Sequence, residues 1–261
     1  MGFMKIFILL VPQLHWGLLT GNSYGVAHSE SGSSFYLNDI EFRILNQLIV
    51  LSLSPDIQIK KFKKQLEILL PGSVSHVKML PPGRVLLLPS EQINYHDSAV
   101  LILLFPLKDK IYMCLIRRPS TMKNHAGQIA FPGGKREKED ADLIQTALRE
   151  AQEEIGIAAN TVEILGQLST VYVQISDFLI TPVVGWLNEF PEVKIDSSEV
   201  DEVIIISLED VTDSVNKCER EMETRTGRIM VPGYEINGYF IWGATAMMLA
   251  ELVDIFFDDA Q

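Results

Sequence analysis

The hydrophobic positions of the chain change period along its length, and this change predicts helices first and strands afterwards. Between residues 39 and 70, apolar side chains recur at helical spacing, with a break at Pro55. The two helical stripes are made by Phe42, Leu45, Leu48 and Ile49, and then by Ile59, Phe62, Leu66 and Leu69. We therefore expect two helices that extend the protein on its N-terminal side.

Apolar runs of strand length follow these helices. Residues 98–107 form an almost unbroken apolar run, and residues 111–116 form a second one after the polar turn Lys108–Lys110. β-branched residues concentrate again at 161–173, 179–186 and 203–207. We expect strands in all of these segments.

The chain ends on another helical pattern, which predicts a helix from about Ala244 to Phe257. The residues that recur at helical spacing there are Met247, Met248, Leu252 and Ile255. Strands and helices do not alternate in a simple βαβ order along the chain. The predicted fold class is therefore α/β, with a mixed sheet between helices and an N-terminal helical extension.

The first 38 residues have a weaker pattern that leaves several interpretations open. An apolar run from Ile6 to Val11 follows Lys5, as in a signal peptide, but Pro12 ends it early. The alternatives are a membrane-proximal tail and a start codon placed too far upstream. The run is too short for a transmembrane helix, so we expect no membrane association. We divide the chain into a tail that is a candidate for disorder (1–38), a helical extension (39–95) and the main domain (96–261).

Composition narrows the function classes. The 261 residues include 22 Lys and Arg against 34 Asp and Glu, which gives a formal net charge of -12. Sequence-independent binding to nucleic acid depends on neutralising phosphates, so we expect no nucleic-acid partner. Cys114 and Cys218 form no CxxC pair, so neither a disulfide framework nor a zinc site is indicated. A reducing compartment follows from this, and we expect a cytoplasmic protein.

One segment, Phe131 to Ile157, carries the candidate chemistry. We expect a helix from about residue 141 to 155, with Asp140 suited to the N-cap position, Asp142 to the first turn and Gly156 to the C-terminal cap. The side chains expected to face the core are Ile144, Ala147, Leu148, Ala151 and Ile155.

Three carboxylates share one patch of this helix, because Glu150, Glu153 and Glu154 are three and four residues apart. Like charges at this spacing cost roughly 0.2 to 0.5 kcal/mol per pair. A divalent cation reverses that sign, and oxygen ligands on a rigid helix suit Mg²⁺ or Mn²⁺. The alternative is a solvated acidic face. The turn Gly133-Gly134 favours the metal, because glycines let the backbone approach a metal or phosphate closely.

Together these residues resemble the Nudix box, whose usual form is Gly, five residues, Glu, seven residues, and then Arg-Glu-apolar-x-Glu-Glu-x-Gly-apolar. The run Arg149-Glu150-x-x-Glu153-Glu154-x-Gly156-Ile157 matches its second half, and Gly134 matches its beginning. The spacing from Gly134 to Arg149 is one residue longer than usual, and either Asp140 or Asp142 replaces the first Glu. Which of these acids pairs with Arg149 to brace the loop is left open by the sequence.

The resemblance implies an α/β/α sandwich and a metal-dependent hydrolase, in which water attacks a phosphorus of a nucleoside diphosphate derivative. It implies that Glu150 and Glu154 are ligands of Mg²⁺ or Mn²⁺, and that Glu153 is a third ligand or a base. Arg149 joins Glu150 and Glu153 among the candidate catalytic residues.

A fourth acid from outside the helix is common in the family that the box resembles. The segment Ser198-Glu199-Val200-Asp201-Glu202 offers Glu199 as the candidate, with Glu202 as the alternative. Either residue would bring a further carboxylate to the metal site from a different part of the chain.

The segment before the box narrows the substrate. Arg118-Pro-Ser-Thr-Met-Lys123-Asn-His125-Ala-Gly127-Gln128 runs on to Phe131-Pro-Gly-Gly134 and resembles an additional signature of the coenzyme A pyrophosphatase branch. Ser176 to Pro182 and Ile241 to Ala246 are similar to that branch as well. The resemblance implies cleavage of coenzyme A to 3′-phosphoadenosine 5′-phosphate and 4′-phosphopantetheine. The substrate-binding residues that it implies are Arg118, Lys123, His125, Gly127, Gln128, Gly133 and Gly134.

The charges of this segment fit a small phosphorylated nucleotide. Glu137 is the acidic residue of the stretch 117–138, whose basic residues are Arg117, Arg118, Lys123, Lys135, Arg136 and Lys138. The branch usually has Arg where this chain has Lys123, which keeps the charge but loses bidentate geometry. His125 has two interpretations, a hydrogen bond that stabilises the loop and a role in proton transfer.

Two other functions stay open on sequence grounds. The first is hydrolysis of another nucleoside diphosphate derivative, such as ADP-ribose or a dinucleotide. The second is a Nudix-fold module that binds a nucleotide without cutting it, although such modules usually lose box glutamates and this chain keeps all three. The N-terminal helices are candidates for mediating a homodimer or for covering the pocket.

Overall fold

The computed structural model describes residues 44–68, 70–86, 95–120, 126–223 and 227–257 with their side chains, and residues 14–15, 25–29, 34–37, 39–43 and 224 by their backbone. These residues form two compact units, one within 1–53 and the other within 54–258. The domain boundaries drawn from the sequence, at residues 38 and 95, remain predictions.

The unit within residues 1–53 contains a small antiparallel sheet and a helix. Its strands are β1 (Leu14–His15), β2 (Gly25–Ser29) and β3 (Ser34–Leu37), in the order β1-β2-β3. Helix α2 (Asp39–Ser52) follows. This helix is the first of the two helices that the apolar stripes predict.

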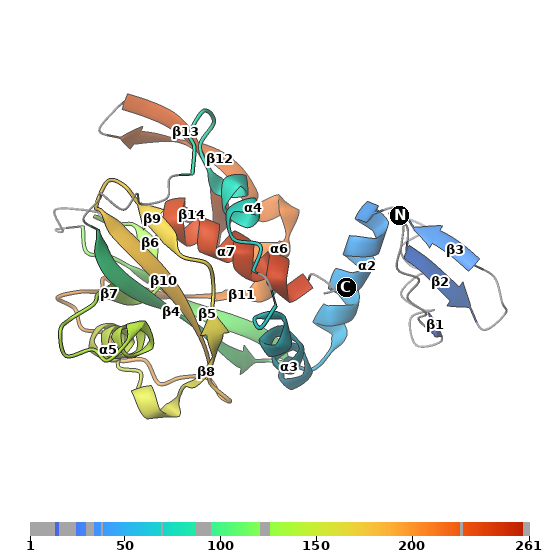
Figure 1. The fold of residues 1–261 in the computed structure, drawn as a ribbon, viewed down its shortest axis with the longest axis horizontal. Helices are drawn as coiled ribbons and strands as arrows, with labels where there is room; N and C mark the ends of the chain where they lie inside the picture. The colour runs from blue at the N-terminus through green and yellow to red at the C-terminus, as the bar shows by residue number, and fades with distance from the viewer. Residues whose placement is uncertain are drawn as a thin grey trace. The chain divides into compact units, whose positions relative to one another are not determined.

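The unit within residues 54–258 is built on a mixed sheet (Figure 1). Its main path has the order β11-β5-β4-β10-β8, in which β4 and β10 are parallel and the other neighbours are antiparallel. The strands of this path are β11 (Glu202–Ser207), β5 (Lys110–Arg117), β4 (His96–Leu107), β10 (Phe178–Trp186) and β8 (Glu163–Gln167). The predicted mixed sheet is therefore confirmed.

Three short strands extend this path, two of them next to the predicted site. Strand β6 (Ile129–Ala130) pairs with β5, and β7 (Gly133–Lys135) pairs with β4. Strand β9 (Val171–Val173) pairs with β10. The turn Phe131–Pro132 thus leads the chain from the edge of one central strand to the edge of its neighbour.

Helices cover both faces of the sheet, which makes an α/β/α sandwich as predicted (Figure 1). Successive side chains of a strand point to opposite faces, so β4 divides its apolar residues between two cores. Leu101 and Leu103 pack with α5 (Leu143–Ile155), whereas Ile102 and Leu104 belong to the core that contains α7 (Gly243–Phe257). The side chains of α5 that are fully buried in the first core are those of Ala147, Ala151 and Ile155.

The second predicted helix packs onto the α7 side of the sandwich. Helix α3 (Pro55–Gln65) begins at Pro55, where the sequence predicts a break. Its Phe62 ring stacks on the ring of Phe256 in α7, with centroids 4.1 Å apart. The short helices α4 (Ser73–His76) and η2 (Val77–Met79) follow it and also contact α7.

Part of the fold lies outside the sequence predictions. Strands β12 (Lys217–Thr224), β13 (Gly227–Ile236) and β14 (Tyr239–Trp242) form a separate antiparallel sheet. Helix α6 (Leu208–Thr212) and the short 3₁₀ helices η3 (Ala159–Thr161) and η4 (Ser214–Asn216) are also additional. Among the described residues, no helix has both the length and the apolar character needed to cross a membrane.

A buried carboxylate joins α7 to its surroundings. Glu251 accepts hydrogen bonds from the backbone amides of Gly72 at 3.1 Å and Ser169 at 3.2 Å. His76 Nε2 lies 2.9 Å from the other oxygen of the same carboxylate. Burial alone would raise the pKa of Glu251, but the hydrogen bonds with His76 and Ser169 outweigh it and lower the pKa. The contacts fix the position of α7 between α4 and the segment that precedes β9.

Candidate active site

The strand β7 and the end of α5 are joined through Gly133 and Glu154. The amide of Gly133 donates a hydrogen bond to Glu154 Oε2 at 2.8 Å, in a buried environment. Gly133 has a φ of +156°, and a Cβ at this position would lie 2.3 Å from the carbonyl oxygen of Ala99. Only glycine allows β7 to approach β4 this closely, and that approach places the amide beside the helix.

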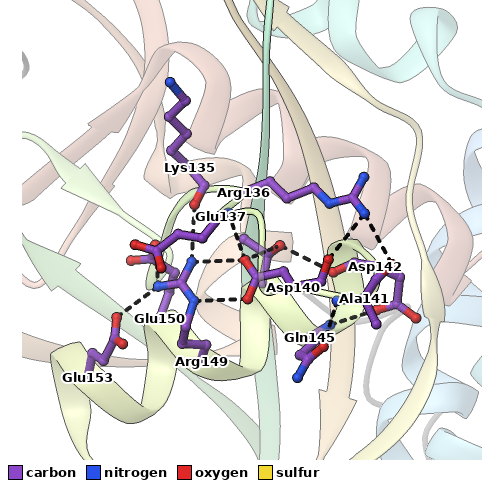
Figure 2. Close-up of polar contacts among 11 residues, drawn as sticks. Lys135, Arg136, Glu137, Asp140, Ala141, Asp142, Gln145, Arg149, Glu150 and Glu153 are labelled. Atoms are coloured by element: carbon purple, nitrogen blue, oxygen red, sulfur yellow. Dashed lines mark hydrogen bonds and ion pairs between the residues drawn. The ribbon is translucent and has the colours of Figure 1, made fainter.

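Arg149 and Asp140 brace the loop between β7 and α5, as Figure 2 shows. Arg149 Nε donates to Asp140 Oδ1 at 3.0 Å, and Nη2 donates to Oδ2 at 3.1 Å. Nη2 also donates to the backbone carbonyl of Lys135 at 3.1 Å. The amide of Glu137 and the hydroxyl of Thr146 donate to the same carboxylate. Of the two acids that the sequence left open, Asp140 is therefore the partner of Arg149.

The start of the helix corrects one sequence prediction. Asp142, and not Asp140, is the N-cap residue of α5, because its side chain accepts a hydrogen bond from the amide of Gln145 at 2.8 Å. Asp140 lies two residues before the N-cap position, and its carboxylate is occupied by Arg149. The predicted C-terminal cap is confirmed, since Gly156 is left-handed with a φ of +74°.

The three glutamates of the helix lie in different environments. The side chain of Glu154 is 3% exposed and that of Glu150 is 14% exposed, whereas that of Glu153 is 52% exposed. Arg149 Nη1 lies 3.0 Å from Glu150 Oε1 and 2.9 Å from Glu153 Oε2. Figure 2 shows the guanidinium between these two carboxylates. Glu150 and Glu154 therefore form an inward pair, and Glu153 lies at the rim.

Burial and mutual repulsion make the inward pair reluctant to ionise. Burial, the largest cause, raises the pKa of Glu154 to about 8, with further contributions from the charges of Glu150 and Glu199. The hydrogen bond from Gly133 and the charge of Arg118 oppose this rise. Burial also raises the pKa of Glu150, against the effect of Arg149. Negative charges crowded in this way are stabilised by a cation.

Gly134 creates the space that the Glu150 carboxylate occupies. A Cβ on Gly134 would lie 2.5 Å from Glu150 Oε1 and 2.6 Å from the carboxyl carbon. The glycine pair of the box therefore has two separate structural roles. Gly133 brings an amide to Glu154, and Gly134 leaves room for Glu150.

The loop before the box is closed at its base by backbone hydrogen bonds. The amide of Arg118 donates to the carbonyl of Gln128 at 3.0 Å, and the amide of Gly127 donates to the carbonyl of Arg118 at 3.1 Å. Arg118 Nη1 lies 3.9 Å from Glu154 Oε1, so this arginine faces the acidic pair. Lys123 and His125, which the sequence also assigns to substrate binding, lie outside the described residues.

The structure separates the two candidates for the fourth acid. Glu199 lies between β10 and β11, in a segment that contacts the end of α5: the amide of Asp196 donates to the carbonyl of Glu154 at 3.1 Å. Its charge raises the pKa of both Glu150 and Glu154. Glu202 is instead engaged by Arg117 at 3.1 Å and by the Tyr239 hydroxyl at 2.6 Å. Of the two candidates, Glu199 is thus the one whose charge affects the inward pair.

The residues present fit a hard divalent cation. The inward carboxylates are buried and repel one another. Gly134 has no Cβ, which leaves room for the carboxylate of Glu150. Carboxylate oxygens are the ligands that Mg²⁺ and Mn²⁺ prefer. In the part of the chain that the structure describes, no three acidic, histidine or cysteine side chains are already gathered into a complete ligand set.

Sequence reasoning missed several residues that shape the site. Thr146 supports Asp140 from inside the helix, and Tyr239 in β14 donates to Glu202 in β11. Thr245 lies in the segment Ile241 to Ala246, whose resemblance to the branch gave this residue no role, and its hydroxyl donates to the carbonyl of Ile129. Each makes its contact with a hydroxyl group. A single hydroxyl in an otherwise apolar or mixed segment leaves no periodic signal, so the pattern of the sequence gives no means of finding it.

Comparisons with known proteins identify the family of this chain. The NUDIX domain family matches residues 95–225. The uncharacterized Nudix hydrolase NudL of Photorhabdus laumondii is 33% identical over 173 residues, which cover 66% of this chain and 89% of the relative. The NudL protein of Yersinia enterocolitica is 36% identical over 162 residues, which cover 61% of this chain and 80% of the relative.

Solved structures of Nudix proteins are also similar to this chain. A binary complex of Ap4A hydrolase from C. elegans is 22% identical, with a TM-score of 0.37, and the likeness covers 44% of this chain and 82% of that one. The NUDIX domain of Shewanella oneidensis NrtR, complexed with ADP ribose, is 20% identical with a TM-score of 0.37. This likeness covers 46% of this chain and 77% of that one. These likenesses are distant. The family match and the relatives show that the chain belongs to the Nudix family of pyrophosphohydrolases.

Proposed function

We propose that the protein hydrolyses the pyrophosphate linkage of coenzyme A or its derivatives, and that it uses Mg²⁺ or Mn²⁺. The products are 3′-phosphoadenosine 5′-phosphate and 4′-phosphopantetheine. The observation that carries the proposal is the position of Arg118. This residue begins the loop that resembles the coenzyme A pyrophosphatase signature, and its guanidinium faces Glu154 at 3.9 Å. A substrate phosphate held by Arg118 would therefore lie beside the inward acidic pair.

Glu150 and Glu154 would hold the divalent ion, with Glu199 as a further acid. Their burial and the effect of the Glu199 charge on both support this assignment. When bound, the ion supplies charge neutralisation for the bridged phosphates and for the charge that develops during hydrolysis. The carboxylates supply the rigid oxygen donors, and Gly133 and Arg149 fix their orientation.

Glu153 has a different task from the inward pair. Its carboxylate is half-exposed at the rim and is held by Arg149 at 2.9 Å. It is the candidate for taking a proton from the attacking water, with service as a third metal ligand as the alternative. Asp140 and Arg149 are positioning residues: Asp140 holds Arg149 against the loop, and Arg149 in turn orients Glu150 at 3.0 Å and Glu153 at 2.9 Å.

The basic residues of the loop and box divide into two groups. Arg117 is paired with Glu202, and Arg136 Nη2 donates to the carbonyls of Asp140 and Ala141 at 3.2 and 3.1 Å. Lys135 extends away from the Arg149 network in Figure 2, so its ammonium can meet a phosphate. We expect Arg118 and Lys135 to supply the positive charge that attracts the polyphosphate of the nucleotide.

A substrate panel tests the substrate assignment. Coenzyme A, ADP-ribose and a diadenosine polyphosphate are incubated with the purified protein and Mg²⁺ or Mn²⁺, and the products are separated by chromatography. The proposal predicts that coenzyme A has the highest kcat/KM. Equal or faster cleavage of ADP-ribose or the dinucleotide would remove the coenzyme A assignment and keep the metal site. Binding without cleavage of any of them would identify a nucleotide-binding module.

Two variants make the panel sharper. Arg118→Ala should raise KM for coenzyme A, because it removes the guanidinium that faces the acidic pair. Glu139→Gln is the control, since Glu139 is an exposed acid of the loop between β7 and α5 and has no assigned role. An Arg118→Ala protein with unchanged KM would contradict the proposed substrate contact.

A further inference from the structure

The loop from Arg118 to Gln128, the substrate loop, has the backbone carbonyl of Ile129 at its base. Among the described strands of the sheet, this carbonyl has no partner. Strand β6 pairs with β5 in the antiparallel register Arg117↔Ile129. The amide of Arg118 already donates to the carbonyl of Gln128. In an antiparallel ladder the neighbouring residue points its polar groups the other way, so the carbonyl of Ile129 points away from β5.

Thr245 provides the partner that the sheet does not. Its hydroxyl donates a hydrogen bond to the carbonyl of Ile129 at 3.0 Å, in a buried environment. Thr245 and Ile129 are each 8% exposed, so water has little access to either group. A buried carbonyl that loses its donor is costly, because it keeps the desolvation penalty without the bond.

The helix that carries Thr245 is a rigid support. Helix α7 buries Leu249 and Leu252 completely in the core. Further along the same helix, the Glu251 carboxylate accepts hydrogen bonds from Gly72 and Ser169. The core therefore fixes the position of α7, and the hydrogen bond from Thr245 fixes the base of the substrate loop to this helix.

The opposite side of the same base is also held. The amide of Asp201 donates to the carbonyl of Arg117 at 2.9 Å. The side chain of Arg117 is paired with Glu202, which in turn accepts a hydrogen bond from the Tyr239 hydroxyl at 2.6 Å. The pair formed by Arg117 and Ile129 is thus fixed from both strand edges, directly before the loop that begins at Arg118.

We infer that Thr245 is a positioning residue for the substrate loop, and that it sets substrate affinity by holding the Ile129 carbonyl. The inference rests on the proposed function of that loop. The Thr245 hydroxyl donates to the carbonyl of Ile129, which is not part of the inward acidic pair. Thr245 therefore acts through the place that it gives to Arg118. An Arg118 that has lost this support must be brought back into place each time a substrate binds, which weakens binding and leaves the metal site unchanged.

The test compares Thr245→Val with Thr245→Ser. Valine keeps the shape and removes the donor, whereas serine keeps the donor. We expect Thr245→Val to raise KM about tenfold with kcat changed less than about twofold, and Thr245→Ser to restore KM. Ser75→Ala is the matched control, because it removes a hydroxyl hydrogen bond to Asp254, near the other end of α7. It should leave KM unchanged.

Hydrogen exchange gives a second readout that does not depend on activity. The amides of Arg118 and Gly127 close the loop and should exchange faster in Thr245→Val than in the wild type or in Thr245→Ser. If the wild type cleaves none of the pyrophosphate substrates, the proposed function fails and this measurement still decides the inference. A lower melting temperature with unchanged KM and unchanged exchange at these amides would overturn it. Thr245→Ala serves as the second donor-free variant if the valine protein does not fold.

Discussion

The carboxylate of Asp140 accepts two hydrogen bonds from the guanidinium of Arg149, at 3.0 and 3.1 Å. Five residues separate Gly134 from Asp140, as in the usual Nudix box, so the additional residue of this chain lies between Asp140 and Arg149. An aspartate thus replaces the glutamate that the box normally has. The brace persists because Thr146 and the Glu137 amide hold the shorter carboxylate within reach of the arginine.

Asp140→Asn should destabilise the protein by about 3 kcal/mol, because it removes the buried carboxylate that accepts two hydrogen bonds from the Arg149 guanidinium. The hydrogen bond from Arg149, the largest cause, lowers the pKa of Asp140 to about 2. A lowered pKa contributes stability above the unfolded value of 3.8, and this contribution is lost as the pH falls towards 2. Urea denaturation between pH 2.5 and 7 checks this. Asp142→Asn is the control, since asparagine also serves as an N-cap. Equal stability of Asp140→Asn and wild type at pH 7 would contradict the brace.

Gly134→Ala should displace the Glu150 carboxylate and leave the fold intact. The new Cβ would lie 2.5 Å from Glu150 Oε1, and the flexible glutamate side chain moves more easily than the sheet. We expect kcat/KM to fall by about 100-fold and Mn²⁺ affinity to fall with it, since displaced ligands bind a metal poorly. Calorimetric titration with Mn²⁺ and a melting curve measure the two effects separately. Wild-type metal affinity in this variant would show that Glu150 is not a ligand.

Metal binding should release protons near pH 7. The pKa of Glu154 is raised to about 8, chiefly by burial, so at pH 7 the metal-free protein holds a proton that a cation displaces. The raised pKa also favours the folded state as long as Glu154 is protonated. This contribution to stability is full below pH 4.5 and is lost as the pH rises through about 8. Titration with Mg²⁺ in two buffers of different ionisation enthalpy counts the protons. Glu154→Gln should abolish the release and Glu153→Gln should preserve it, and a release that survives Glu154→Gln would assign the proton elsewhere.

Glu251→Ala should cost about 3 to 5 kcal/mol of stability, because it removes the acceptor of buried backbone donors and of His76. The hydrogen bonds to Glu251 lower its pKa against the effect of burial, so the stabilisation is present above 4.5 and is lost at lower pH. Thermal unfolding at pH 7 measures the loss. Glu209→Ala is the comparison, since it breaks only the exposed ion pair with Lys110 and should cost less than about 1 kcal/mol. Equal melting temperatures for the two variants would show that Glu251 does not anchor α7.

Elements with a strong apolar period could be predicted from the sequence. The run 98–107 became β4 and the stripe near 244–257 became α7, because each buries its apolar side chains in a core. Strands β12 and β13 could not be found in this way. Lys217 to Thr224 carries charged residues at most positions and alternates few apolar ones, so its pairing depends on contacts with β13.

In the candidate site, too, some features could be predicted from the sequence and others depend on packing. The three-and-four spacing correctly placed Glu150 and Glu154 together on the helix, since that spacing is a property of the helix itself. The sequence did not distinguish the buried Glu154 from the half-exposed Glu153, because burial depends on how β7 packs against α5. It also assigned the N-cap to Asp140, since helix caps and bracing acids have the same composition.

The account depends most directly on the inward acidic pair, and one measurement tests it. Coenzyme A hydrolysis by the wild type is followed as Mg²⁺ is raised from zero, beside a Glu150→Gln, Glu154→Gln double variant whose melting temperature confirms folding. We predict metal-dependent formation of 3′-phosphoadenosine 5′-phosphate by the wild type, and a loss of at least about 1,000-fold in the double variant. Wild-type activity in a folded double variant, or activity without added metal in the presence of a chelator, would contradict the account.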